Sequence, residues 1–238
     1  MTESIALYNA DCRQVLPQEA DVIITDPPYG VTKKGDMLGQ IAPNYHGKGT
    51  HTRGYADHDV QAFSDLLRPA FDLMLGSVPK GGLMLAWCGN RTLAQMVNHA
   101  EFVGWQMLDL VVFTGGGSWA KSKSMLAPRH ETAALMRRPG GIRNFNSDRT
   151  KTNHIHLTKT RGESDHPTTK PQTWMRAAVE AFTEPGETVL DPFAGSGSTL
   201  VAAHATGRGF IGIERDADFA GIAARRIGDS VRERRLTA

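Results

Sequence analysis

The sequence predicts an α/β protein with a doubly wound, mostly parallel sheet. Two observations lead to this prediction. Strand-like segments alternate with segments of helical periodicity along the 238 residues, and several of the strand-like segments are near-continuous apolar runs. Parallel strands that are buried on both faces need such runs. Alternation of this kind is typical of a parallel sheet with helices on both of its faces.

The expected strands are short apolar runs that end at polar or turn-forming residues. They lie at residues 5–8, 22–25, 83–87, 107–113, 132–136, 188–190 and 210–213. Helical periodicity lies between them, at residues 60–77, 90–103, 172–183, 198–205 and 217–231. Asn90 and Ser198 are suited to cap two of these helices, because their side chains can accept a backbone hydrogen bond. We expect a single domain.

Two stretches interrupt this alternation. Residues 30–59 and 137–165 are polar and have little apolar periodicity. Loops of this length are uncommon inside a compact domain, and they are usually functional or disordered. We therefore expect neither stretch to contribute much to the core.

Composition excludes several classes of protein. The chain is 40% apolar and 22% charged, as ordinary globular domains are. It has no secretory leader and no apolar run near the ~20 residues that span a bilayer, so we expect a cytoplasmic protein. Cys12 and Cys88 are the only cysteines and have no C-x-x-C spacing, which argues against a disulfide framework and a sulfur-ligated zinc site.

The charge is unevenly distributed along the chain. The net charge is +2, but residues 121–170 contain eleven Lys and Arg against four Asp and Glu, which leaves an acidic remainder. This asymmetry indicates a polyanionic partner for one region of the chain. A solvated basic surface is the alternative.

The histidines form no recognisable metal site. His46, His51 and His58, like His154 and His156, match no ligand spacing and lack sulfur partners. We expect no bound metal, and we expect these histidines to lie in polar loops.

The stretch "DVIITDPPYG", residues 21–30, ends an apolar strand abruptly. Asp26 follows the strand and is itself followed by Pro27, Pro28 and Tyr29. Two prolines fix φ and remove backbone N–H groups, so the turn presents acceptors only. A carboxylate, carbonyl oxygens and an aromatic ring are thereby placed at the end of a buried strand.

A second motif, "ETVLDPFAGSGSTLVAA", residues 187–203, joins a strand to a helix. After Asp191, Gly195 and Gly197 allow the backbone to approach a ligand beside the helix N-terminus. A further strand ends at Glu214, nineteen residues after Gly195, about where an acid receives ribose hydroxyls. Phosphate-binding fingerprints are incomplete here, so a non-phosphorylated adenosine ligand fits best. An ordinary strand-turn-helix corner is the alternative.

The two motifs together resemble those of the S-adenosylmethionine-dependent DNA amino-methyltransferases, which methylate exocyclic amines of adenine or cytosine. Residues 26–29, Asp-Pro-Pro-Tyr, are similar to the catalytic tetrapeptide of that family, and residues 191–197 are similar to its cofactor motif. Between them, "HPTTKP", residues 166–171, resembles the segment that precedes the cofactor strand. This order resembles the β subclass. The resemblance runs from Leu7 to Glu214 and implies one Rossmann-like catalytic domain over the chain, in a bacterial or phage-infected cell.

The resemblance implies that Asp26, Pro27, Pro28 and Tyr29 are catalytic. An exocyclic amine is a poor nucleophile because its lone pair is delocalised into the ring. Asp26 can accept one hydrogen bond from the amine, and the Pro27 carbonyl can accept another. Tyr29 offers a π face to a base that has been extruded from the duplex. We expect a direct, in-line methyl transfer in which positioning supplies most of the acceleration.

The resemblance also implies a pocket for S-adenosyl-L-methionine. The residues expected in it are Asp11, Thr168, Lys170, Asp191, Phe193, Gly195, Gly197 and Glu214. Glu214 is expected to hold the ribose. Asp11 has an alternative role as the cap of a helix that begins at "CRQVL", and Lys170 is alternatively a solvated lysine at a helix start.

Contacts with double-stranded DNA are expected from the irregular stretches. The insert at residues 137–165 is similar in position to the target-recognition region of the family, and its Lys, Arg and Asn residues suit phosphates and adenine edges. Residues 118–138 resemble the segment that frames the extruded base, and residues 30–59 are expected to form a mobile loop on the DNA side. The expected DNA-binding residues are Trp119, Arg129, Arg143, Arg149, Lys151, Lys159 and Arg161. Trp119 is alternatively a partly buried structural residue.

The recognition insert is short for the family, and one helix follows Glu214. Either the DNA target is short or two copies share the DNA. A homodimer formed through the sheet-side helices is the corresponding hypothesis.

These observations predict an N6-adenine DNA methyltransferase. Asp before Pro-Pro-Tyr favours adenine through the resemblance alone, because other side chains can also accept from an amine. An N4-cytosine methyltransferase on the same scaffold is the first alternative. An RNA or protein-glutamine methyltransferase and a catalytically idle DNA-binding module are weaker alternatives. The basic insert and the motif order count against the former, and the intact tetrapeptide and glycine turn count against the latter.

Overall fold

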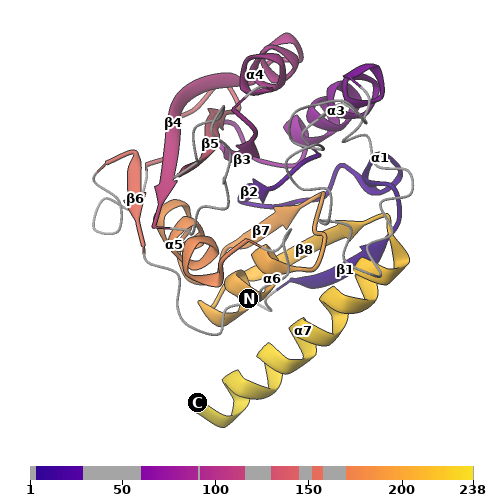
Figure 1. The fold of residues 1–238 in the computed structure, drawn as a ribbon, viewed down its shortest axis with the longest axis vertical. Helices are drawn as coiled ribbons and strands as arrows, with labels where there is room; N and C mark the ends of the chain where they lie inside the picture. The colour runs from indigo at the N-terminus through magenta and orange to yellow at the C-terminus, as the bar shows by residue number, and fades with distance from the viewer. Residues whose placement is uncertain are drawn as a thin grey trace, which may run out of the picture.

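The computed structural model describes residues 4–28, 60–90, 92–115, 130–144, 152–157 and 170–237. Within these residues, eight strands form one sheet in the order β1-β8-β7-β2-β3-β5-β4-β6 (Figure 1). The strands are β1 (Ile5–Asn9), β2 (Val22–Thr25), β3 (Leu83–Cys88), β4 (Gln106–Thr114), β5 (His130–Arg137), β6 (His154–His156), β7 (Thr188–Asp191) and β8 (Gly209–Glu214). The helices are α1 (Cys12–Val15), α3 (Val60–Leu75), α4 (Leu93–Phe102), α5 (Gln172–Phe182), α6 (Ser198–Ala205) and α7 (Ala217–Thr237).

Most neighbouring strands of the sheet are parallel. β1, β8, β7, β2 and β3 all run in one direction, β6 is parallel to β4, and β5 is antiparallel to both β3 and β4. Every residue of β2, β3 and β8 is buried. This burial explains why these strands are apolar without alternation, and the predicted doubly wound fold is confirmed.

Helices cover both faces of the sheet. Successive residues of β2 point to opposite sides, as the pleat requires. Val22 and Ile24 pack in the core that includes residues of α5, α6 and α7, whereas Ile23 packs with residues of α1, α3 and α4. The sheet is therefore the middle layer of three, and its strand ends are held from both sides.

The helix starts differ from the sequence expectation at two positions. Asn90 was expected to cap α4, but the N-cap is Thr92, and the Gly89 carbonyl accepts from Thr92 N and Leu93 N. The expected cap Ser198 is instead the first residue of α6, and Gly197 is its N-cap with φ of +80°. In both cases a backbone turn determines where the helix begins.

Two short elements carry little signal in the sequence: β6 was not predicted, and α1 was raised only as the alternative in which Asp11 caps a helix at "CRQVL". β6 lies within the 137–165 insert and pairs with β4 at the end of the sheet, and α1 is a single four-residue turn. Elements this short contain too few residues to display a period. The predicted loop at 30–59 lies outside the described residues. In the described part of the chain, no helix is long and apolar enough to cross a membrane.

Candidate active site

Acidic residues gather where the parallel strands end. Asp11 follows β1, Asp26 follows β2, β7 ends at Asp191 and β8 ends at Glu214. These strands are parallel, and β1, β8, β7 and β2 are consecutive in the sheet. Their carboxyl ends therefore lie along one edge, which is the edge where open α/β sheets bind ligands.

The Glu214 carboxylate holds the glycine turn after β7. Gly195 and Gly197 have φ of +51° and +80°, a region that glycine adopts without strain. Gly195 N donates to Glu214 Oε2 over 2.8 Å, and Asp216 N donates to Glu214 Oε1 over 2.7 Å. Burial raises the pKa of Glu214 above its usual value, although these two donors oppose the shift. Glu214 is thus fixed directly beside the turn.

The backbone at Gly195 faces open space. Apart from the glycine itself and its two chain neighbours, no described atom lies within 4 Å of the place where a Cβ on Gly195 would stand. A Cβ added to Gly197 would come within 2.9 Å of Ala223 Cβ in α7. One glycine therefore leaves room beside the backbone, and the other permits close packing of α6 against α7.

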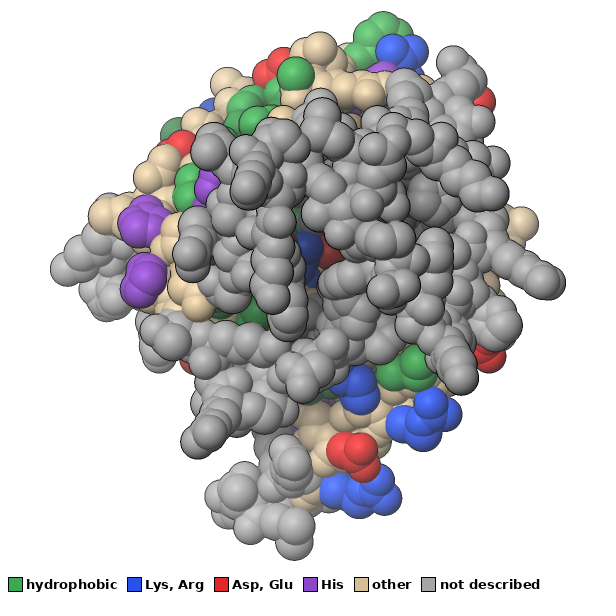
Figure 2. All heavy atoms as spheres, in the orientation of Figure 1, with side chains coloured by type: hydrophobic (Ala, Val, Ile, Leu, Met, Phe, Trp, Pro, Cys, Tyr) green, Lys and Arg blue, Asp and Glu red, His purple; other side chains and the backbone are tan. Residues whose placement is uncertain are grey.

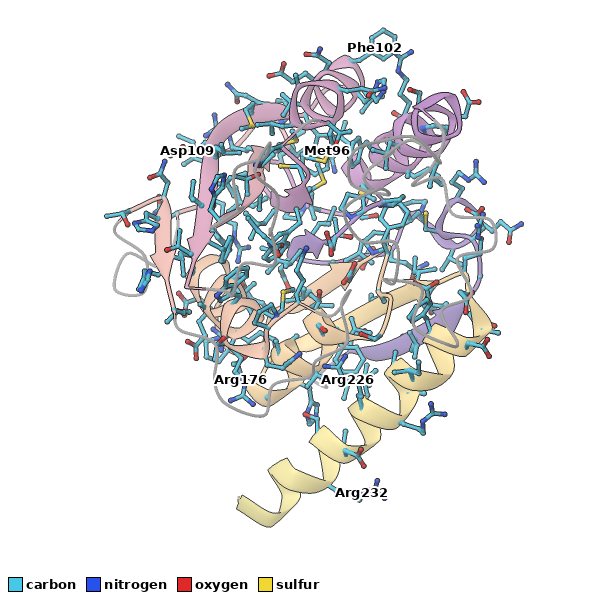
Figure 3. The ribbon with its side chains drawn as sticks, viewed as in Figure 1. Met96, Phe102, Asp109, Arg176, Arg226 and Arg232 are labelled. Carbon is cyan, nitrogen blue, oxygen red and sulfur yellow. The ribbon has the colours of Figure 1, made fainter. Side chains whose placement is uncertain are left out.

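Arg226, on α7, supports the same turn from behind (Figure 3). Its Nη1 donates to Ser196 O over 2.6 Å and lies 3.0 Å from Ser196 Oγ and 3.2 Å from Ser198 Oγ. Burial lowers the pKa of this guanidinium. Sequence reasoning did not identify Arg226, because no motif marks an arginine two turns into a helix.

Asp191, expected in the cofactor pocket, is turned into the protein and is 2% exposed. Its Oδ1 accepts from the Thr25 hydroxyl over 2.7 Å and from Phe193 N over 3.1 Å. Burial raises its pKa to about 6, against opposing hydrogen bonds from the Thr199 and Thr25 side chains. The carboxylate therefore connects the end of β2 with the turn after β7.

The ammonium group of Lys170 forms ion pairs with both Asp26 and Glu131. Lys170 Nζ lies 3.1 Å from Asp26 Oδ2 and 2.7 Å from Glu131 Oε2. The side chain of Lys170 is 13% exposed and that of Asp26 is 29% exposed, so Lys170 is not a solvated lysine. The structure places Lys170 beside the expected catalytic carboxylate, and Glu131, on β5, was not identified from the sequence.

Asp11 is the N-cap of α1. Its carboxylate accepts from Arg13 N over 3.0 Å and forms an ion pair with the Arg13 guanidinium over 2.6 Å. The hydrogen bond with the Arg13 side chain lowers the pKa of Asp11. The capping role, weighed as an alternative from the sequence, is confirmed.

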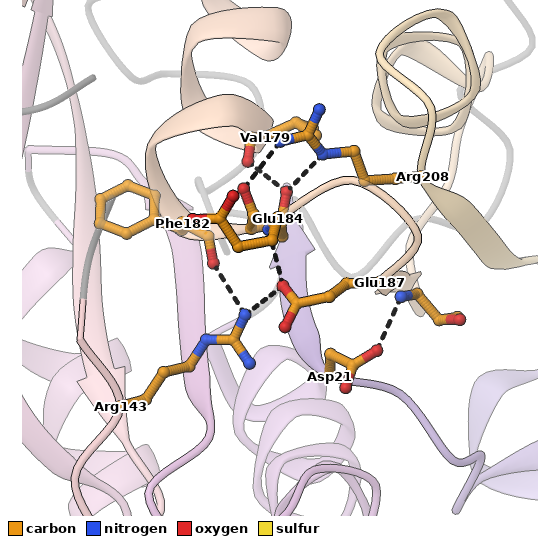
Figure 4. A network of polar contacts seen from close by, with 9 residues as sticks. Asp21, Arg143, Val179, Phe182, Glu184, Glu187 and Arg208 are labelled. Atoms are coloured by element: carbon orange, nitrogen blue, oxygen red, sulfur yellow. Dashed lines mark hydrogen bonds and ion pairs between the residues drawn. The ribbon is translucent and has the colours of Figure 1, made fainter. Parts of the chain in front are cut away.

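Several expected site residues lie outside the described part of the chain. They are Tyr29, Thr168, Trp119, Arg129, Arg149, Lys151, Lys159 and Arg161. Arg143 is described, and its guanidinium donates to Glu187 and, over 3.4 Å, to Phe182 O (Figure 4). Glu187 immediately precedes β7, so Arg143 is at the amino edge of the sheet, opposite Asp26. This position gives its expected DNA contact no support.

Charged and histidine side chains also lie on the surface away from this edge. Figure 2 shows histidines gathered over β6 and arginine side chains along α7. His154 Nε2 and His156 Nδ1 each lie 2.8 Å from Thr114 Oγ1. Among the described residues, no group of three or more His, Cys, Asp and Glu side chains is arranged to hold a metal ion.

The sheet is doubly wound, and a glycine turn and an acid lie at the carboxyl ends of its adjacent strands. This arrangement is typical of α/β enzymes that bind a nucleotide-type ligand at the carboxyl edge. The comparisons with known proteins then narrow this class. The chain belongs to the DNA methylase family of N6 and N4 methyltransferases, whose family model matches residues 20–225.

A curated relative agrees with this assignment, and solved structures share the fold. The chain is 32% identical over 210 residues to a protein of Escherichia coli strain K12 named "Putative methylase YubD", covering 86% of this chain and 82% of that one. The fold of this chain resembles the crystal structure of the M1.HpyAVI-SAM complex, with a TM-score of 0.68 and 22% identity. The match covers 94% of this chain and 100% of that one. The fold also resembles the cytosine-N4-specific PvuII DNA methyltransferase, with a TM-score of 0.72, 14% identity, and coverage of 95% and 87%.

Proposed function

We propose that this chain is a site-specific DNA methyltransferase that transfers the methyl group of S-adenosylmethionine to the exocyclic N6 amine of an adenine flipped out of duplex DNA. One observation carries the proposal. Asp26 follows β2 and the glycine turn follows β7, and β2 and β7 are neighbouring parallel strands. The Asp26 carboxylate, which can accept from an amine, and the glycine turn, which can bind a cofactor, therefore lie side by side at one edge of the sheet.

The site suits S-adenosylmethionine in two respects. The open space beside Gly195 lets a ligand approach the backbone of the turn. The Glu214 carboxylate is anchored by Gly195 N and Asp216 N, and its oxygens have further lone pairs that can accept from ribose hydroxyls. When bound, the cofactor supplies a sulfonium methyl group that an amine can attack.

Asp26 and Pro27 act on the amine. The Asp26 carboxylate accepts one N–H of the amine and the Pro27 carbonyl accepts the other, which aligns the lone pair with the incoming methyl group. The N–C bond forms as the S–C bond breaks, and the proton that the amine loses leaves toward the Asp26 carboxylate or water. The ion pair with Lys170 orients the Asp26 carboxylate for this step.

We assign DNA binding to the two polar stretches of the chain, residues 30–59 and 137–165. The 137–165 insert serves as the target-recognition region, and β6 anchors part of it on the sheet. The stretch at 30–59 follows the tetrapeptide directly in sequence, and we assign it to the DNA side of the protein. As an enzyme of DNA, the protein works in the cytoplasm of a bacterial or phage-infected cell.

Cytosine N4 is the second candidate target. An amine on a pyrimidine poses the same chemical problem, and the fold also resembles that of a cytosine-N4-specific enzyme. Adenine is favoured by the similarity of Asp26-Pro27-Pro28-Tyr29 to the tetrapeptide of adenine enzymes. RNA and protein-glutamine substrates and an inactive DNA-binding module remain weaker alternatives.

The test is to identify the modified base. The purified protein is incubated with unmethylated duplex DNA and S-adenosylmethionine, and the DNA is digested to nucleosides for mass spectrometry. N6-methyladenine is the expected product. N4-methylcytosine would keep the mechanism and overturn the choice of base, and no modified nucleoside would overturn the proposed function.

The short insert leads us to propose a homodimer that shares one DNA site. Sedimentation velocity, with the protein free and bound to a duplex, is expected to show two copies on the DNA. A monomer in both states would refute the dimer and leave the methyl-transfer proposal intact.

A further inference from the structure

Asp191 is a buried acid whose hydrogen bonds reach three different segments. Its carboxylate accepts from the Thr25 hydroxyl on β2, from Phe193 N in the turn after β7, and from the Thr199 side chain on α6. Burying a charge is costly unless donors compensate it. These donors fix the carboxylate in one orientation, directed into the protein.

Thr25 is equally constrained. It is the last residue of β2, it is fully buried, and Asp26 follows it. Its β-branched side chain has few rotamers, and one of them is held by the 2.7 Å bond to Asp191 Oδ1. A shift of Thr25 therefore shifts the carboxylate that meets the amine.

The Thr25–Asp191 bond lies where the backbone pairing of the two strands has ended. The β2–β7 ladder pairs Val22 with Val189 and Ile23 with Leu190 and stops there. The side-chain bond is the next link between the two strands. On one side of it the chain continues into Asp26, and on the other side it continues into the glycine turn.

We infer that Thr25 and Asp191 form a positioning pair that sets the spacing between the catalytic carboxylate and the cofactor turn, and that Asp191 serves this spacing instead of contacting the cofactor. This inference rests on the proposed function. An error of about 1 Å in the placement of reacting groups can cost on the order of 100-fold in rate. A buried bond that joins the supports of both groups is well placed to prevent such an error.

The test compares three single substitutions of buried threonines. Thr25→Val keeps the side-chain shape and removes the hydroxyl, whereas Thr25→Ser keeps a hydroxyl. Thr183→Val is the matched control, because Thr183 is also buried and its hydroxyl bonds Val179 O and Arg208 Nε at the amino edge. For each variant we would measure the single-turnover rate of methyl transfer at saturating S-adenosylmethionine and DNA, and the Kd of the cofactor by calorimetry.

Thr25→Val is expected to slow methyl transfer by about 10-fold to 100-fold, with the cofactor Kd changed by less than about threefold. Thr25→Ser is expected to restore most of the rate, and Thr183→Val to leave it within about threefold of the original. Equal effects of Thr25→Val and Thr183→Val, or no rescue by Thr25→Ser, would overturn the inference.

Asp191→Asn tests the same pair if Thr25→Val fails to fold. An amide oxygen can still accept from Thr25 and Phe193 N, so the cofactor Kd is expected to stay within about threefold of the original. A Kd raised by about 100-fold with an unchanged rate at saturation would assign Asp191 to the cofactor and overturn the inference. The unsubstituted protein serves as the reference throughout, since its failure to methylate DNA would contradict the proposed function and not the pairing.

Discussion

Acidic side chains lie at both the amino and the carboxyl edge of the sheet, but their hydrogen-bond partners differ. At the amino edge, acids and cations form a local network (Figure 4). Glu187 accepts from Arg143 and from Glu184 N, Asp21 accepts from Thr188 N, and Arg208 donates to both Thr183 Oγ1 and Thr183 O. These contacts join loops to strand starts, so their chemistry serves the fold.

At the carboxyl edge, neutral donors hold the most buried acids. Asp191 accepts from a threonine hydroxyl and a backbone N–H, and Glu214 accepts from two backbone N–H groups. Burial raises the pKa of both. Asp26 lies beside Lys170, which it shares with Glu131. Glu187 at the amino edge is neutralised by Arg143, whereas Asp191 and Glu214 at the carboxyl edge are buried against neutral donors that orient them.

Removing Asp26 should give the largest effect. Asp26→Ala is expected to lower the single-turnover rate by at least about 1000-fold, because the amine loses its charged acceptor. The cofactor Kd should change by less than about threefold, since Asp26 faces the amine. Asp72→Ala, at an exposed position of α3, is the control. A cofactor affinity that collapsed along with the activity would show that Asp26 is wrongly placed.

Asp191→Asn should change how stability depends on pH. The pKa of Asp191 is raised from 3.8 to about 6, so the folded state holds the proton more tightly than the unfolded state does. The resulting stabilisation is complete below pH 3.8 and is lost as the pH rises through about 6. Compared with Asp191→Asn, the unsubstituted protein should lose up to about 3 kcal/mol of unfolding free energy between about pH 4 and pH 7. Urea titrations across this range measure the difference, and parallel pH curves would mean that Asp191 titrates normally.

Glutamate substitutions at the two edges should separate binding from stability. Glu214→Gln is expected to raise the cofactor Kd by about 10-fold to 100-fold, because charged hydrogen bonds contribute about 1.5–3 kcal/mol. Glu187→Gln is expected to lower the melting temperature by weakening the pair with Arg143, and to leave the Kd unchanged. Calorimetry and thermal unfolding of both variants provide the check. Equal changes of the cofactor Kd in Glu214→Gln and Glu187→Gln would contradict the functional difference between the two edges.

Basic residues should give the smallest effects. Lys151→Ala or Arg149→Ala is expected to weaken DNA binding and to reduce the slope of log K against log salt by about one. Arg143→Ala, at the amino edge, is expected to lower stability and leave the salt slope unchanged. Fluorescence anisotropy with a labelled duplex at several salt concentrations measures these slopes. A salt slope that falls for Arg143→Ala and not for Lys151→Ala would reverse the assignment of the DNA-binding side.

Sequence reasoning predicted most strands and helices because their signals are local. The apolar run at 22–25 and the small-residue helix at 198–205 coincide with β2 and α6. Where such signals were weak, the prediction was incomplete. The polar last turns of α7 run beyond the expected end at residue 231 to Thr237, and the three residues of β6 depend on their pairing with β4.

The sequence by itself determined the family, the order of the two motifs and the glycines that the turn requires, because each of these depends on residue type and spacing along the chain. Only the tertiary structure decided which groups meet. It turned Asp191 inward to Thr25, 166 residues away, brought Lys170 between Asp26 and Glu131, and placed Arg143 at the far edge. Side-chain direction depends on burial and on partners distant in the chain, and no local pattern encodes these.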